Sequence, residues 1–73
     1  MMLKFTLSYQ NGMAITHTCD SYQAFLSSLV KSEAVSTKIL AWLVEYKDLR
    51  ADTQYSYWNS GCTVYLRKEK VNV

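Results

Sequence analysis

The sequence has no proline, only two glycines and no long apolar run among its 73 residues. So little proline and glycine argues against a disordered linker, and an apolar content of 49% is enough for a core. Residues 1–73 are expected to form one small domain. The longest apolar run, residues 39–44, is too short to cross a membrane. Polar residues interrupt the N-terminal apolar pattern, so no signal peptide is expected and the cytoplasm is the expected compartment.

Groups that carry catalysis or bind metals are also scarce. Cys19 and Cys62 are too few for a disulfide scaffold and are expected to be buried thiols. With His17 they would supply three ligands where a structural zinc needs four, so His17 is expected to be a partly buried, hydrogen-bonded residue. Phosphate-binding loops and zinc-protease motifs are absent, and the six acids show no spacing that fixes two carboxylates across a substrate. We therefore expect no enzyme, no metal and no cofactor.

The first nineteen residues alternate apolar and polar side chains, which is typical of two half-buried strands. The strands are predicted at residues 3–9 and 13–19. A two-residue turn at the Asn-Gly pair would put their apolar sets on opposite faces. A three-residue loop, residues 10–12, pairs Leu7 with Ile15 and puts both sets on one face. We favour this loop because burial of a large apolar side chain, about 1.5–3 kcal/mol, outweighs turn preference.

A helix is predicted after the hairpin. Asp20 is the expected N-cap, and Gln23 occupies the second position of a capping box. Helical spacing then relates the apolar residues Tyr22, Phe25, Leu26, Leu29 and Val30. This amphipathic helix is expected to end near Ser32 or Glu33 and to lie on a sheet.

Residues 35–46 fit two structures. A helix would place on one face the side chains of Val35, Ile39, Trp42, Leu43 and Tyr46. The solid apolar run at 39–44 equally fits a strand buried on both faces. A single helix over residues 21–48 would be about 42 Å long, too long for a domain with a radius of gyration of about 11 Å. We favour a strand over residues 38–47, followed by a polar connection at 48–52; a helix–turn–helix is the alternative.

Residues 53–67 predict a second hairpin, because threonine, tyrosine and tryptophan suit strands. A three-residue loop at 59–61 would pair Trp58 with Cys62 and Tyr55 with Tyr65. The core face then holds Trp58, Cys62, Val64 and Leu66. The outer face holds Thr53, Tyr55, Tyr57, Thr63, Tyr65 and Arg67. A slip of one residue would instead bury Tyr55, Tyr57, Val64 and Leu66 together.

These segments predict an α+β fold, a two-layer sandwich with the element order ββαβββ. One amphipathic helix covers one face of an antiparallel sheet, and the other face stays partly open. The alternative order is ββααββ. The charges at Lys68, Glu69 and Lys70 predict a frayed basic tail over residues 68–73.

The outer tyrosine-rich face is the predicted binding surface, because tyrosine and arginine often dominate interfaces. The predicted partner-binding residues are Tyr55, Tyr57, Tyr65, Arg67 and Lys68. We expect another protein as the partner, with the chain acting as a small inhibitor or adaptor. An accessory protein of a bacterium or phage would have this size. No membrane partner is expected.

Two other partners are alternatives. Single-stranded nucleic acid could stack on the same aromatic face while Arg67, Lys68 and Lys70 hold phosphates. The net charge of +2 permits this but does not favour it. A homodimer could also form through an uncovered edge strand, such as residues 64–68.

Overall fold

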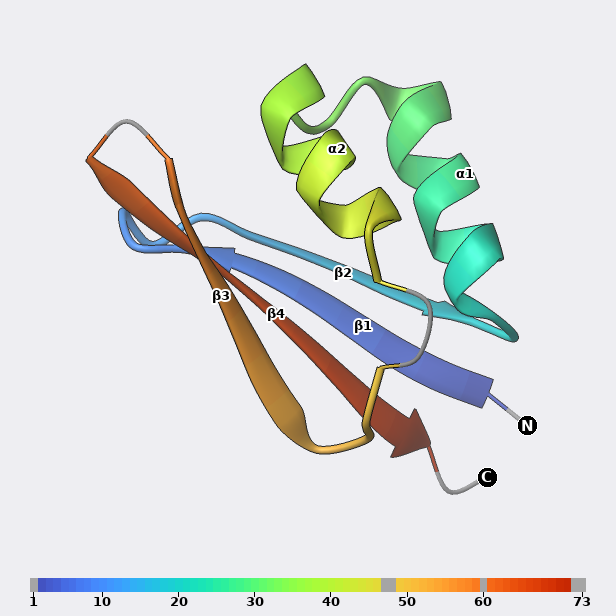
Figure 1. Ribbon diagram of the computed structural model, residues 1–73. Helices are drawn as coiled ribbons and strands as arrows, with labels where there is room; N and C mark the ends of the chain where they lie inside the picture. The colour runs from blue at the N-terminus through green and yellow to red at the C-terminus, as the bar shows by residue number, and fades with distance from the viewer. Residues whose placement is uncertain (1, 47–48, 60, 72–73) are drawn as a thin grey trace.

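The chain folds as two β-hairpins separated by two helices (Figure 1). The computed structural model describes residues 2–46, 49–59 and 61–71. In chain order the elements are β1 (Met2–Tyr9), β2 (Ala14–Cys19), α1 (Tyr22–Ser32), α2 (Thr37–Val44), β3 (Thr53–Asn59) and β4 (Cys62–Val71). The α+β class is confirmed. The favoured ββαβββ order with a single helix is wrong, and the alternative ββααββ order is the one observed.

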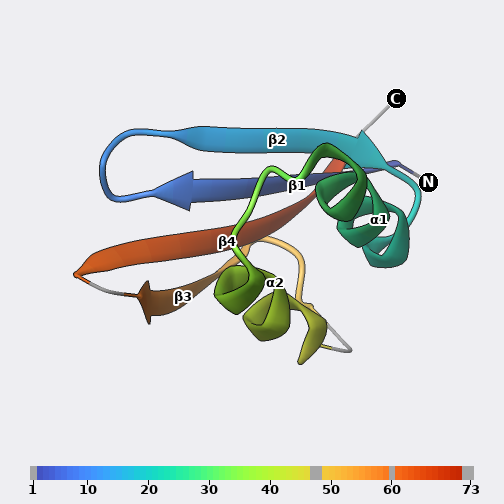
Figure 2. The same ribbon diagram turned by 90° about the horizontal axis from the view of Figure 1, so that it is seen from above.

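The four strands form one antiparallel sheet in the order β2-β1-β4-β3. The hairpins join through β1 and β4, so these strands are central and β2 and β3 are the edges. The edge strand predicted at residues 64–68 is therefore wrong, since β4 is paired on both sides. Both helices lie on one face of the sheet, and within the described chain no helix covers the other face (Figures 1 and 2).

The first hairpin has the predicted three-residue loop. Leu7 pairs with Ile15, and the backbone N–H of Tyr9 donates to the carbonyl of Met13 at 2.7 Å. Gly12 ends the loop with a φ of 99°, which residues with a Cβ atom rarely adopt. The apolar side chains of β1 and β2 consequently share the face that the helices cover.

α1 has the predicted end but a different cap. The hydroxyl of Ser21, not the carboxylate of Asp20, caps the helix by accepting from the backbone N–H of Ala24 at 3.1 Å. Serine and aspartate cap helices about equally well, so adjacent candidates cannot be separated by type. The helix ends at Ser32, and Glu33 follows in the left-handed conformation with a φ of 53°.

α2 replaces the predicted strand because its apolar run is buried on one side only. Ile39, Trp42 and Leu43 are buried toward the sheet, whereas Val44 is 59% exposed. A strand inside the sheet would have covered both sides of this run. The hydroxyl of Ser36 caps the helix by accepting from the N–H of Ile39 at 3.4 Å. Of the helices in the described residues, neither α1 nor α2 has the length and apolar character needed to span a membrane.

The register of the second hairpin is shifted by one residue from the favoured prediction. Asn59 pairs with Cys62, where the favoured prediction had Trp58 opposite Cys62. A shift of one residue turns every side chain of β3 to the other face of the sheet. Tyr55 and Tyr57 therefore point toward the helices and Trp58 points away. The favoured register is wrong, and the slipped alternative is confirmed.

Contacts of β3 with Trp42 of α2 and with Tyr46, two residues after α2, explain this register. Tyr57 stacks on Trp42 with ring centroids 5.1 Å apart, and Tyr55 contacts Tyr46 with centroids 5.0 Å apart. The indole N–H of Trp42 also donates to the Tyr46 hydroxyl at 3.0 Å. Each aromatic pair contributes about 0.5–1.5 kcal/mol beyond burial of its area. These partners exist only when residues 37–44 form a helix over β3.

The C-terminal residues are more ordered than predicted. β4 runs through Val71, which pairs with Met2, so the predicted frayed tail is wrong for residues 68–71. Residues 72–73 lie outside the described residues. In the predicted polar connection at 48–52, Leu49 is buried in the core, and its carbonyl accepts from the Lys68 ammonium at 3.0 Å.

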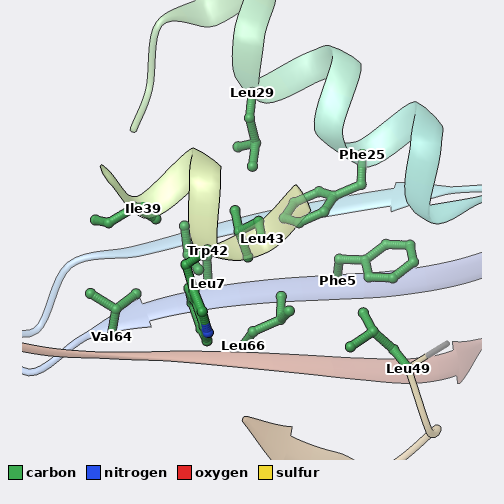
Figure 3. Close-up of a cluster of buried hydrophobic side chains, with 10 residues drawn as sticks. All are labelled: Phe5, Leu7, Phe25, Leu29, Ile39, Trp42, Leu43, Leu49, Val64 and Leu66. Carbon is green, nitrogen blue, oxygen red and sulfur yellow. The ribbon is translucent and has the colours of Figure 1, made fainter. Parts of the chain in front are cut away.

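The core lies between the sheet and the two helices (Figure 3). Its buried side chains are Phe5, Leu7, Phe25, Leu29, Ile39, Trp42, Leu43, Leu49, Val64 and Leu66. Phe5 and Phe25 are fully buried and stack with ring centroids 4.9 Å apart. The two helices are joined where the Tyr22 hydroxyl donates to the Leu43 carbonyl at 2.6 Å.

Tyr22→Phe is expected to lower the free energy of unfolding by about 1 kcal/mol at neutral pH, because it removes one hydrogen bond. Burial, together with the nearby Tyr46 phenol, raises the pKa of Tyr22 well above its usual value. Above a pH of about 10 the unfolded chain releases this proton and the folded chain keeps it, so stability falls as pH rises. Urea unfolding should show that the difference in free energy of unfolding between wild type and Tyr22→Phe is smaller above pH 10 than at pH 8. A constant difference would contradict the burial of this phenol.

Candidate functional site

The uncovered side of the sheet, here called the open face, consists of the side chains that the strand register turns away from the helices. On β1 and β2 these are Met2, Lys4, Thr6, Ser8, Ala14, Thr16 and Thr18. On β3 and β4 they are Gln54, Ser56, Trp58, Thr63, Tyr65, Arg67, Glu69 and Val71. The large aromatic side chains of this face therefore all stand on β3 and β4.

Trp58, Tyr65 and Arg67 form the candidate contact cluster. Trp58 pairs with Thr63 and Ser56 pairs with Tyr65, so the two aromatic residues are diagonal neighbours on adjacent strands. Arg67 follows two residues after Tyr65, on the same face of β4. The Trp58 side chain is 69% exposed, more than any other large apolar side chain in the described residues. A tryptophan and a tyrosine beside a guanidinium thus lie on a face open to a partner.

The open face carries little charge. Its charged side chains in the described strands are Lys4, Arg67 and Glu69, which leaves a single net positive charge. The Arg67 Nε atom lies 3.8 Å from the Glu69 Oε1 atom, and both side chains are partly exposed. Such an exposed ion pair contributes at most about 1 kcal/mol to stability. The Arg67 guanidinium can therefore leave Glu69 and bind another carboxylate at little cost.

Three of the five predicted partner-binding residues lie on the helix side of the sheet. Tyr57 stacks under α2, and the Tyr55 hydroxyl accepts from the backbone N–H of Arg50 at 3.0 Å. The Lys68 ammonium donates to the carbonyl of Leu49. These side chains make contacts within the fold. The predicted place of Tyr55 and Tyr57 on the outer face, with Tyr55 opposite Tyr65, is wrong because of the register shift.

Tyr65 and Arg67 do lie on the open face, and sequence reasoning missed Trp58 beside them. The favoured register had placed Trp58 in the core. A signal was present, because the slipped register puts Trp58 outside and two tyrosines inside with Val64 and Leu66. Gly61, with a φ of 83°, did not decide between the registers, since either loop accepts a glycine at that position.

The structure brings no metal site together from His17, Cys19 and Cys62. Among the described residues there is no group of three or more potential ligands. Cys19 pairs with Leu3 near the start of β1, whereas Cys62 lies beyond the opposite end of that strand. The predicted partial burial of His17 is confirmed, and its ring centroid lies 5.9 Å from that of Phe25, whereas the predicted hydrogen bond of its side chain stays a prediction.

The two cysteines are free thiols, and the prediction that they are buried is wrong, because both are only partly buried at the ends of their strands. Burial raises the pKa of the Cys19 thiol, and the neighbouring Asp20 carboxylate adds to this effect. The thiol also donates to the carbonyl of Ser21 at 3.4 Å. Cys19 therefore stays protonated near neutral pH, which does not suit a nucleophile.

The helix layer holds a hollow of about 750 Å³, between α1 and the C-terminal end of α2, whose lining is apolar in its larger part. Leu26, Val30 and Val44 line it, together with Tyr22 and Tyr46. Val30 is 55% exposed there. The hollow lies away from the open face, so substitutions in it can serve as controls for the cluster around Trp58.

Comparison of the chain with family models, with curated proteins and with solved structures finds no match in any of the three. Its function is therefore inferred from the open face and the helix layer themselves.

Proposed function

We propose that this chain is a small, non-enzymatic binding protein that holds another protein against its open face, as an inhibitor or adaptor. Trp58, Tyr65 and Arg67 are the contact residues. The observation that supports this most strongly is the exposure of Trp58, which lies beside Tyr65 on a face that no helix of the described chain covers.

The contact residues have the chemistry and rigidity of an interface centre. Tryptophan, tyrosine and arginine dominate interface energetics because they bury a large area at a low cost in conformational entropy. Tyr65 and Arg67 stand on β4, which is hydrogen-bonded on both sides, so little ordering is needed when the partner arrives. The phenol and the guanidinium can bind carboxylate or carbonyl oxygens of the partner, while the indole ring supplies apolar area.

Single-stranded nucleic acid is the second candidate, since Trp58 and Tyr65 could stack on bases. Phosphate binding also requires several cations on the same surface. The open face has one net positive charge, and Lys68 is turned to the helix side, where its ammonium binds Leu49. The charge distribution therefore favours a protein partner.

Trp58→Ala and Tyr65→Ala test the proposal. The immobilised chain captures its partner from a native lysate, and calorimetry with the purified partner then measures each affinity. Each substitution is expected to weaken binding at least tenfold, about 1.4 kcal/mol, because each removes a large side chain from the interface. Val30→Ala in the hollow is the matched control and is expected to change binding less than twofold.

Two results would contradict this assignment. Weaker binding by Val30→Ala with unchanged binding by Trp58→Ala would place the interface on the helix layer. Salt-sensitive binding of labelled oligonucleotides that Trp58→Ala abolishes would instead support nucleic acid as the ligand. Circular dichroism of each variant is the control that checks whether the fold is kept.

A further inference from the structure

The outer edge of β2 has backbone groups that no other strand of the described residues pairs with. β2 pairs with β1 on one side only. Its six residues, AITHTC, include no lysine, no acid and no proline, and its pairing with β1 continues without a bulge from Ala14 to Cys19. Edge strands of natural proteins usually carry a charged residue, a proline or a bulge, and each of these hinders the addition of another strand. This edge can therefore accept one.

The other edge, β3, is obstructed by a helix. Seen from above, α2 projects past β3 at that margin of the sheet, whereas neither α1 nor α2 projects past β2 (Figure 2). On the same side, Tyr57 of β3 contacts Trp42 of α2, and Tyr55 contacts Tyr46, two residues after α2 ends. A second chain that paired with β3 would bring its own α2 to this crowded margin, so β2 is the free edge.

We propose that β2 pairs with β2 of a second copy of this chain, antiparallel, around a two-fold axis perpendicular to the sheet. An antiparallel strand edge is complementary to itself, which suits a symmetric dimer. The two four-stranded sheets would become one continuous sheet. Both helix layers then lie on one side, and the two open faces form one surface on the other.

The side chains of β2 select the register with Thr16 on the axis. In this register the two Thr16 side chains face each other on the open face, and cross-strand threonine pairs are favourable. On the helix side, Ile15 faces His17 of the second copy. In the register with His17 on the axis, each imidazole would face the other imidazole in place of the apolar side chain of Ile15.

The same dimer also covers an exposed apolar side chain, Met13, at the end of the hairpin that α1 does not reach. α1 lies over the Cys19 end of β2 and does not extend to the loop at residues 10–12 (Figure 2). Met13, beside that loop, is 60% exposed. Because the paired strands run in opposite directions, Met13 faces Cys19 of the second copy and lies near the second copy's α1. This reciprocal cover of Met13 identifies a second copy as the partner that fits the edge.

Light scattering across a dilution series tests the dimer, whose mass is expected to be twice the chain mass of 8.4 kDa. Thr16→Lys places two like charges at the axis and is expected to raise the dissociation constant at least tenfold. Gln54→Lys is the matched control, since Gln54 and Thr16 are exposed at opposite ends of one row of paired residues across the sheet. It is expected to leave the dimer unchanged. Should Thr16→Lys lose its fold by circular dichroism, Thr18→Lys on the same edge replaces it.

A disulfide test gives an independent result. In a chain with Cys19→Ala and Cys62→Ala, Thr16→Cys is expected to form a linked dimer on mild oxidation, because facing Cα atoms in antiparallel pairs lie about 4.5–5.5 Å apart. Gln54→Cys is expected to stay unlinked. A chain that is monomeric throughout the dilution series, or a dimer that only Gln54→Lys disrupts, overturns the proposal. A monomeric chain leaves partner binding through Trp58 unaffected, and the affinity of Trp58→Ala for the partner is measured independently, so the two proposals fail separately.

Discussion

Alanine in place of Phe5 is expected to lower the free energy of unfolding by about 3–5 kcal/mol. The Phe5 side chain is fully buried on a central strand, stacks on Phe25 and lies 5.6 Å from the ring of Tyr22. A domain of this length has only about 4–11 kcal/mol of stability in total. The variant should therefore lose about a quarter or more of its free energy of unfolding, which urea unfolding followed by circular dichroism will measure.

The loss is large because the structure cannot close the space that the ring leaves. Phe5 stands between the sheet and α1, and Phe25 faces it across that layer (Figure 3). Filling the cavity would require α1 to move toward β1, while α1 is held to α2 by the bond from Tyr22 to Leu43. Val44→Ala is the matched control: its side chain is exposed, so a change within about 0.5 kcal/mol is expected. A loss below about 1 kcal/mol for Phe5→Ala would contradict the packing described here.

The first hairpin and α1 could be predicted from the sequence because their patterns are local. Only the three-residue loop puts Leu7 and Ile15 on one face, and burial of both apolar sets decides between the two loops. The helical spacing from Tyr22 to Val30 and the end at Ser32 also depend on neighbouring residues alone. The cap was misplaced by one residue because two good cap residues stand side by side.

Residues 37–44 and the register of β3 depend on each other, and no local pattern fixes either. The apolar run at 39–44 by itself fits a strand. The contacts of Trp42 with Tyr57 and of Tyr46 with Tyr55 are what favour the helix, and they are distant in sequence. These contacts bury the tyrosines and so turn Trp58 to the open face. Tyr65 and Arg67 could be predicted as exposed because both lie on β4, whose alternation relative to Val64 and Leu66 is the same in either register.

Alanine at Tyr57 is expected to lower stability and leave partner affinity unchanged, whereas alanine at the adjacent Trp58 is expected to do the reverse. Tyr57→Ala removes the ring that stacks on Trp42 beneath α2 and should cost about 2 kcal/mol of stability, because the ring is partly buried. Trp58→Ala removes an exposed side chain and should change stability by less than about 0.5 kcal/mol. Urea unfolding measures both values.

Partner affinity should follow the reverse order. Trp58→Ala should weaken binding at least tenfold, whereas Tyr57→Ala, compared at a temperature where it is still folded, should bind within about twofold of wild type. Leucine at position 57 restores apolar volume beneath α2 and should recover part of the stability without changing the affinity. If Trp58→Ala were the destabilising change and Tyr57→Ala the one that weakened binding, Trp58 would pair with Cys62, and the tyrosines would lie on the open face. A shift of one residue separates these two outcomes, because it exchanges the inner and outer side chains along the whole of β3.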